Sequence, residues 1–245
     1  MSRVPRGRWI VAVCVLAALG IAGTADAQTT SRPGPWSLDL RGVTSPVPDD
    51  PVFYPNLIPS ALVPDRGFGI EAGAHVYLLN IGASRLGIGA SLFAIRSITE
   101  PAPAPETPPA SGQTPAAAGQ SVQVDLRMLT PQISFNFGTR DGWSYLSAGA
   151  GRTGVVTKTS GAIAGRREAE PVTALNVGGG ARWFIKSHFG VGFDIRFHMV
   201  GAGTAGAIEQ TSPPLLPPIT PLPPTAPAAT PSMRLLTISG GFSFK

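Results

Sequence analysis

The 245-residue chain has little cysteine and little charge. Its single cysteine is Cys14, so the residues that follow offer no disulfide, no thiolate nucleophile and no cysteine-based metal site. Only 13% of the residues are charged, whereas 30 are glycine and 26 are proline. This composition is unusual for a soluble enzyme or a helical bundle, and the low charge also argues against simple disorder.

Long apolar runs are absent after the first 27 residues, and those residues have the features of a secretory signal peptide. Three arginines precede an apolar stretch at 9–22, and Ala25-Asp26-Ala27 fits a small-x-small cleavage site before Gln28. The alternative is an uncleaved anchor helix. The apolar stretch is short for that role, because a membrane-spanning helix needs ~20 apolar residues.

Runs of basic residues are absent as well. Loss of the signal peptide removes three arginines and Asp26, which lowers the formal net charge from +5 to +3. The only basic pair in the remaining chain is Arg166-Arg167, and Glu168 and Glu170 follow it directly. The sequence therefore predicts no nucleic-acid partner.

What the mature chain does contain is a recurring alternation of apolar residues with small or polar ones. Alternation with a period of two is the signature of β-strands whose two faces meet different surroundings. Eight segments show it: Trp36–Gly42, Gly67–Leu79, Arg85–Ser97, Val122–Phe137, Trp143–Thr157, Leu175–Phe184, Phe189–Met199 and Ser232–Phe244.

The fourth segment changes phase in its middle. Its apolar residues occupy even positions as far as Met128 and odd positions from Ile133 onward. The change falls around Pro131, which lacks the N–H group that a strand ladder uses. We therefore expect a β-bulge at residues 129–131.

The connections between these segments alternate in length. Three are short and four are long, and 21 of the 26 prolines fall in the first, second and fourth long connections. Short turns at one end and long loops at the other are typical of bacterial membrane barrels. The short ones are Asn80–Ser84, Gly138–Gly142 and Lys186–His188, and the long ones are Val43–Arg66, Ile98–Ser121, Lys158–Glu170 and Gly201–Pro231.

This pattern predicts an all-β fold: an eight-stranded antiparallel up-and-down transmembrane β-barrel over residues 36–245, preceded by a signal peptide (1–27) and a short segment (28–35). Apolar side chains would face lipid, and glycines with paired charges would fill the interior. Aromatic residues near strand ends would form interfacial girdles: Trp36, Trp143, Tyr145, Trp183, Phe242 and Phe244. The predicted interior ion network consists of Asp39, Arg41, Glu71, Arg182, Asp194 and Arg196.

Residues 176–197 resemble the penultimate hairpin of small outer-membrane barrels, the group that includes the OmpA transmembrane domain and OmpX. A glycine-rich strand ends in Arg182-Trp183, and the next strand carries Asp194-Ile195-Arg196. The resemblance covers roughly residues 36–244 and implies an outer-membrane location, assembly by the barrel-assembly machinery, and contact with outer-membrane lipid and lipopolysaccharide. Such barrels commonly end in an aromatic residue, whereas Phe244 is followed here by Lys245.

Motifs for catalysis or cofactor binding are weak. Gly149–Gly154 matches G-x-G-x-x-G, but a dinucleotide site needs a helix there and the residues that follow favour a strand. His75 and His198 are expected to face the interior from strands that are not neighbours, and His188 is expected in a solvated turn. We therefore expect no catalytic, cofactor-binding or metal-binding residues and no cofactor.

Three functions are compatible with the sequence. The first is a structural or surface-interaction protein whose interior is plugged by the ion network. The second is a narrow passive pore in which the ion pairs rearrange to open a path. The third is an enzyme that modifies lipid at the barrel rim. In the first case the proline-rich loops would meet an extracellular partner through Phe53, Tyr54, Leu215, Leu216, Ile219 and Leu222.

Overall fold

The computed structural model describes residues 33–55, 62–99, 121–161, 164–210 and 228–245. The expected signal peptide and its cleavage site lie outside these residues, as do Leu215, Leu216, Ile219 and Leu222. None of the helices within the described ranges has the length and hydropathy needed to cross a membrane.

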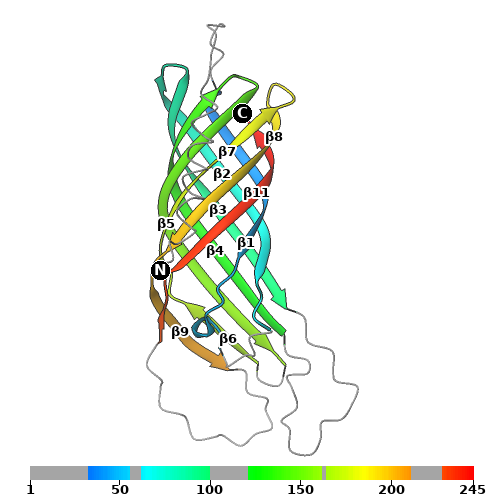
Figure 1. Cartoon of the computed structure of the whole chain (residues 1–245), viewed down its shortest axis with the longest axis vertical. Coiled ribbons are helices and arrows are strands. Elements are labelled where there is room, and N and C mark those ends of the chain that lie inside the picture. Colours follow the sequence, from blue (N-terminus) through cyan, green and yellow to red (C-terminus); the bar gives the residue numbers. More distant parts are fainter. Residues whose placement is uncertain (1–32, 56–61, 100–120, 162–163, 211–227) are drawn as a thin grey trace, which may run out of the picture. The chain divides into compact units, whose positions relative to one another are not determined.

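Eight long strands occur where the alternation predicted them, and most extend a few residues further. Their antiparallel pairing runs β1–β2–β3–β4–β5–β7–β8–β11 and closes when β11 pairs with β1 (Figure 1). The predicted closed eight-stranded antiparallel barrel is confirmed. The strands are β1 (Trp36–Pro46), β2 (Arg66–Ile81), β3 (Ser84–Thr99), β4 (Ser121–Gly138), β5 (Gly142–Ser160), β7 (Val172–Phe184), β8 (Phe189–Val200) and β11 (Met233–Phe244).

The strand register fixes the tilt of the barrel. Tracing Cα partners once around it from Leu146 on β5 returns to the same strand at Val156, ten residues further along. Eight strands with this stagger tilt by about 35–45° and leave an interior only wide enough for side chains. The circuit passes through Gly179, Ile195, Ile238, Thr44, Phe68, Arg96 and Asp125.

The two ends of the barrel differ in their connections. At the short-turn end, tight turns join β2 to β3, β4 to β5 and β7 to β8, as predicted. Gly82 and Gly138 have φ values of 58° and 119° in the first two turns. Glycine suits these positions because it lacks the Cβ that makes positive φ unfavourable. The opposite end, where the other connections lie, is called the long-loop end.

Three short strands extend the sheet at the long-loop end, where the sequence predicted only connections. β6 (Gly165–Ala169) pairs with β5, β9 (Gly203–Gln210) pairs with β6, and β10 (Ala229–Thr230) pairs with β9. The cause is the length of β5, which outruns its partner β7 beyond Thr153. Its free edge at Val156–Thr159 takes β6 as a partner, which satisfies the backbone groups there.

The bulge expected at residues 129–131 does not form. β4 keeps one continuous register with β3 past Pro131, and its register with β5 is the same on both sides of the proline. The phase change reflects a change of surroundings within an unbroken strand. Met128 is buried in the interior at 1% exposure, whereas Ile133 faces outward at 60%.

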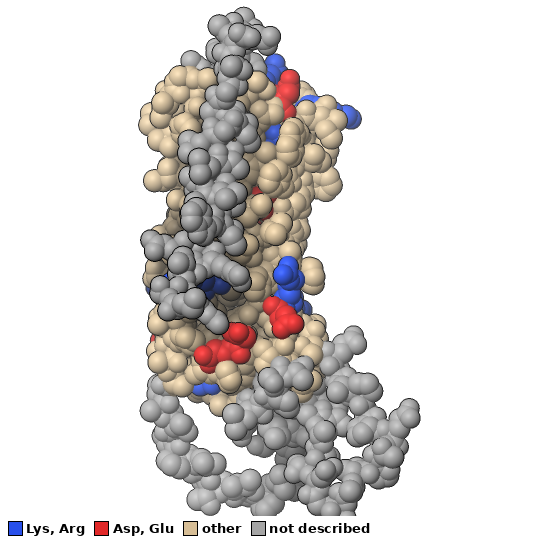
Figure 2. Space-filling view, in the orientation of Figure 1, with Lys and Arg blue, Asp and Glu red and all other residues tan. Residues whose placement is uncertain are grey.

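The outer face of the barrel is an apolar belt, which we define as its outward-facing large apolar side chains. The space-filling view in Figure 2 shows charged side chains mainly toward the two ends of the described barrel. A water-soluble monomer rarely exposes a contiguous apolar surface of this extent. Every barrel strand contributes, for example through Leu38, Phe68, Ile88, Leu129, Leu146, Leu175, Phe193 and Leu236.

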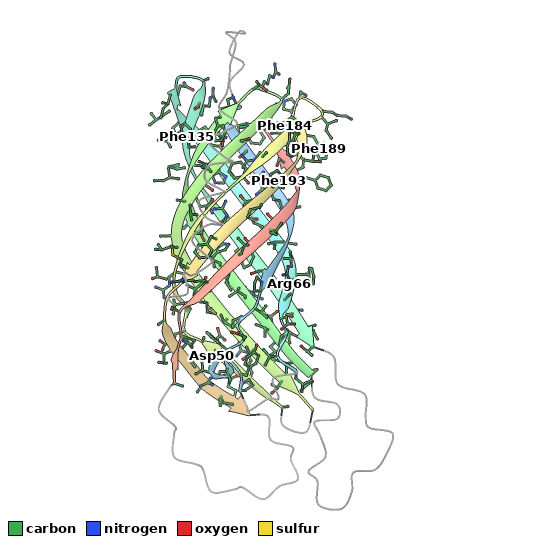
Figure 3. The ribbon with its side chains drawn as sticks, viewed as in Figure 1. Asp50, Arg66, Phe135, Phe184, Phe189 and Phe193 are labelled. Carbon is green, nitrogen blue, oxygen red and sulfur yellow. The ribbon has the colours of Figure 1, made fainter. Side chains whose placement is uncertain are left out.

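Aromatic residues gather near the short-turn end, where Figure 3 labels Phe135, Phe184, Phe189 and Phe193. Four of the six predicted girdle residues are exposed on the outside: Trp36, Trp183, Phe242 and Phe244. The other two were predicted wrongly. Trp143 and Tyr145 occupy odd positions on β5, which face the interior, and they are 1% and 2% exposed.

The β1–β11 pairing that closes the barrel can be tested by cross-linking. In a Cys14→Ser background, we predict that Leu40→Cys with Phe242→Cys forms a disulfide on oxidation, because these residues are Cα partners. A gel of the boiled protein with and without reductant measures the cross-link. Leu40→Cys with Leu236→Cys is the matched control and should stay reduced, and equal yields for the two pairs would contradict this closure.

Candidate functional site

The barrel interior, or lumen, is where the polar side chains of the strands meet. Alternation sends every second residue inward, so β1 contributes Ser37, Asp39 and Arg41, each at most 5% exposed. All six residues of the predicted ion network lie in the lumen, with exposures between 0% and 6%. They come from β1, β2, β7 and β8.

Asp39 is the centre of the first ion cluster. Its carboxylate accepts two hydrogen bonds from Arg182, from Nε at 2.9 Å and from Nη2 at 2.6 Å. Arg41 Nη2 lies 2.8 Å from the same carboxylate, and the Ser243 hydroxyl donates to it at 2.7 Å. A buried carboxylate with this many donors is held in one position.

A second ion cluster forms around Asp194 and Arg196 on β8. The Arg196 guanidinium lies 3.0 Å from the Asp194 carboxylate and also donates to Asn176 at 2.9 Å and Ser147 at 2.8 Å. Tyr145 donates its hydroxyl proton to Asp194 at 2.7 Å. The pair therefore meets partners from two other strands, Asn176 on β7 and Ser147 and Tyr145 on β5.

Tyr145 joins the two clusters. Its hydroxyl holds Asp194, while the Arg182 guanidinium stacks over its ring with the carbon 3.9 Å from the centroid. Gly180 lies beside this arrangement, and a Cβ there would lie 1.9 Å from the Phe193 carbonyl oxygen and 2.9 Å from the Tyr145 hydroxyl. The clusters thus act as one network that spans the lumen in its short-turn half.

Glu71 is the least tightly held member of the predicted network. It accepts a hydrogen bond from Ser239 at 2.8 Å. Arg41 and Arg196 act on it electrostatically, but within the described residues neither comes within 4.0 Å to form an ion pair. The structure therefore brings Glu71 to the network without giving it a direct arginine partner.

A neutral polar layer lies next to the charged network. Gln132 donates to Ser91 at 2.7 Å, and its oxygen is 3.3 Å from His75 Nε2. Gln132 also reaches Asn176, the residue that receives Arg196. Through Ser91 on β3 and Gln132 on β4, this layer extends the network to two further strands.

Several network residues were missed at the level of the sequence. Tyr145, Ser147, Asn176 and Gln132 all contact it, although none was chosen as a site residue. Strand parity was an available signal, because each occupies the same face of its strand as its buried neighbours. Parity does not predict which inward residues from distant strands lie at the same height in the lumen.

The long-loop half of the lumen is filled by apolar side chains. A 3-10 turn, η1 (Pro51–Phe53), inserts Phe53 and Tyr54 into this half, where they are 4% and 2% exposed. We call the assembly the mouth plug. Its other buried members are Val43, Val47, Leu62, Phe93, Ile95, Val122, Val124, Leu126, Met128, Val155, Ala169, Ala174, Val200 and Leu235.

Polar contacts fix the mouth plug to the strands around it. Arg167 on β6 donates to the Val52 carbonyl at 2.6 Å and to the Tyr54 carbonyl at 3.2 Å, and Thr157 donates to the Phe53 carbonyl. Asp50 caps the turn by accepting from the Val52 N–H at 2.9 Å. Burial raises the pKa of the Tyr54 hydroxyl, and the nearby Asp49 adds to this.

These positions correct one prediction. Phe53 and Tyr54 were expected to be surface residues that dock a partner, but both are core residues of the mouth plug. The physical reason is that β4 and β5 direct valine, leucine and methionine inward at this level, and that apolar surface needs a cover. The first connection supplies it.

The short-turn end is narrowed by aromatic packing. Trp143 packs against Tyr77 and Phe184, with ring centroids 6.0 and 5.0 Å away. The Lys245 ammonium lies 3.9 Å from the Phe184 ring centroid, and it donates to the Arg140 carbonyl. The C-terminal lysine is therefore held over this end.

Nothing in the described part of the chain gathers three or more histidine, cysteine or acidic side chains as a metal site would. Gly149–Gly154 lies within β5, so its G-x-G-x-x-G pattern does not precede a helix. His198 is buried, where it stacks on Phe93 and lies 3.1 Å from the Thr237 hydroxyl. It does not lie at an exposed rim.

No protein-family model and no curated protein matches the chain. Among solved structures it is similar to Ail, the attachment invasion locus protein of Yersinia pestis, in complex with the heparin analogue sucrose octasulfate. The sequences are 12% identical over 85% of this chain and 96% of that chain, with a TM-score of 0.46.

Two further solved structures are similar to a comparable degree. For Neisserial surface protein A the identity is 11% over 86% of this chain and 97% of that chain, with a TM-score of 0.46. For the outer membrane protein AlkL in DMPC lipid bilayers the identity is 13% over 91% of this chain and 94% of that chain, with a TM-score of 0.44. The strand pairing of this chain itself closes the barrel.

The Asp39–Arg182 pair gives a stability prediction. Asp39→Ala leaves two buried guanidinium groups without their carboxylate, which we expect to lower the free energy of unfolding by about 3–5 kcal/mol. Ser243→Ala removes one hydrogen bond and should cost about 1 kcal/mol. Urea unfolding in lipid vesicles, followed by tryptophan fluorescence, measures both.

A double-mutant cycle separates pairing from general damage. Arg182→Met combined with Asp39→Ala should cost clearly less than the sum of the two single changes, because the second change removes a charge that the first left unpaired. Additivity within about 0.5 kcal/mol would show that the two residues are not coupled.

Proposed function

We propose that this protein is an outer-membrane barrel that anchors its long loops at the cell surface and does not conduct. The observation that carries the proposal is the combination of an apolar outer face with a lumen closed at several levels. The apolar belt suits contact with lipid on all eight strands. The closed lumen suits an anchor better than a channel.

Three layers support the closed state. Aromatic rings narrow the short-turn end, the ion network spans the lumen beyond them, and the mouth plug fills the long-loop half. Buried charges are costly unless they are paired, so the arginines and aspartates hold one another in place. An ion path would have to open all three layers.

The orientation follows from the connections. Short turns face the periplasm and long loops face the outside in bacterial barrels, which would place the mouth plug at the cell surface. Loops on this side are where an extracellular partner would bind. That role for Leu215, Leu216, Ile219 and Leu222 stays a prediction.

A narrow pore is the second candidate, and one observation favours it. Arg41 and Arg182 share the single carboxylate of Asp39, while Glu71 has a serine as its direct donor. Transfer of Arg41 from Asp39 to Glu71 would change the network without leaving a charge unpaired. In that case the ion pairs would form a gate.

Planar-bilayer recordings separate the two candidates. We predict that the refolded protein shows no lasting conductance, and that Arg196→Ala alone and Phe53→Ser with Tyr54→Ser alone stay closed, because each leaves another layer intact. The combined variant still has the aromatic layer, so only the further addition of Trp143→Ala, which alters all three layers, should give conductance.

Heat-modifiable gel migration serves as the folding control for every variant. Steady conductance by the unaltered protein would overturn the anchor proposal. If that conductance were unchanged in Arg196→Ala, the gate would be wrong as well.

A further inference from the structure

Four arginines lie on the outer face of four consecutive strands, a feature that the lumen does not explain. Arg66, Arg96, Arg127 and Arg152 belong to β2, β3, β4 and β5, and all four are exposed. We call them the arginine row. Figure 3 labels Arg66 in the half of the barrel that also carries Asp50, the cap of η1.

The strand register makes these residues neighbours. The β2 partner of Arg96 is Phe68, two residues from Arg66, and its β4 partner is Asp125, two residues from Arg127. The β5 partner of Arg127 is Gly154, two residues from Arg152. Such diagonal neighbours lie about 7–8 Å apart.

The same offsets keep the row within a narrow range of heights on the barrel. Partner positions climb toward the long-loop end by ten residues per circuit of eight strands, as the path from Leu146 to Val156 shows. Each arginine lies two residues back toward the short-turn end from that climbing path, against a climb of 10/8 = 1.25 residues per strand. Over the three steps from Arg66 to Arg152 the row therefore descends toward the short-turn end by 3 × 0.75, about two residues, and the four arginines stay within one narrow zone of the barrel surface.

The row lies near the long-loop edge of the apolar belt, with Ile98 at 57% exposure as the belt residue beyond Arg96 on β3. Phe68, two residues from Arg66 on β2, is 68% exposed, and Leu129, two residues from Arg127 on β4, is 56% exposed. Both lie on the short-turn side of the row. A molecule that contacts the row can therefore place alkyl chains against the belt.

The row carries more positive charge than the protein balances. Asp125 pairs with Arg96 at 2.6 Å, and Arg152 donates to the Pro171 carbonyl at 2.7 Å. Within the described ranges, neither Arg66 nor Arg127 has an acidic group within 4.0 Å. Lys158, further along β5, adds a charge near Asp125.

We propose that the arginine row binds the headgroup of an anionic lipid that carries two or more phosphates. Guanidinium groups bind phosphate oxygens in pairs, and several of them spaced along a line suit several phosphates better than one. A lipid fits better than a free anion because the belt receives its chains. The proposal rests on the proposed membrane location.

The test measures the thermal midpoint of heat-modifiable migration in zwitterionic micelles as lipid is added. Probes are diphosphoryl lipid A, cardiolipin, monophosphoryl lipid A and inorganic phosphate. We expect either bisphosphorylated lipid to raise the midpoint at lower concentration than the monophosphoryl lipid, and inorganic phosphate to have little effect. The two bisphosphorylated lipids tell a glycolipid from a phospholipid source.

The variant Arg66→Gln/Arg127→Gln/Arg152→Gln should weaken the apparent affinity on the order of 100-fold, because each basic residue near an anionic headgroup contributes roughly fivefold. The control Arg85→Gln/Arg140→Gln/Lys186→Gln removes the same charge at the short-turn end and should change affinity by less than about threefold. Raising the salt concentration should weaken binding to the unaltered protein.

Equal affinity for the two triple variants would overturn the proposal, as would an equal response to inorganic phosphate. The lipid-free midpoint of each variant reports folding separately. A barrel that folds and fails to bind contradicts the arginine row alone, whereas a chain that is freely soluble without detergent contradicts the membrane location.

Discussion

An eight-stranded barrel has room inside for side chains and little else, and this constraint governs the rest of the structure. Each inward residue must be packed or paired with residues from other strands. The protein meets the constraint in two ways. In the short-turn half, Asp39 and Asp194 are paired with arginines through direct contacts of 2.6–3.0 Å. In the long-loop half, apolar side chains pack around Phe53.

Strand β4 contains the boundary between the apolar half and the polar half of the lumen. Its inward residues are valine, leucine and methionine as far as Met128, and then Thr130, Gln132, Ser134 and Asn136. Its outward residues become apolar where its inward residues become polar. One unbroken strand therefore passes from a segment whose inner side is apolar and packed against the mouth plug to a segment with an apolar outer side and a polar inner side.

The sequence was sufficient for the eight barrel strands, their pairing order and the parity of most residues, because alternation is a local signal, but it did not predict the short strands β6, β9 and β10. It was insufficient wherever an answer depended on distant segments. The bulge at Pro131 was wrong because a phase change in one strand does not say whether the backbone or the surroundings changed. From the sequence alone, Phe53 and Tyr54 look like exposed aromatic residues of a loop. Their burial depends on the apolar residues that β4 and β5 direct into the long-loop half of the lumen. Trp143 and Tyr145 were misplaced for a simpler reason, since parity already sent them inward.

The same parity decides what an arginine can do in this fold. Arg182 faces inward on β7, where burial makes an unpaired charge costly and Asp39 is its fixed partner. Arg127 faces outward on β4 at the edge of the apolar belt, where no acidic partner within the described residues neutralises it. A one-residue shift in register would exchange these roles, placing an unpaired charge in the lumen and apolar residues against the ion network. The inner network and the outer row therefore depend on one register, and the mouth plug depends on it too, since Arg167 reaches η1 only from a β6 that pairs with β5 as observed.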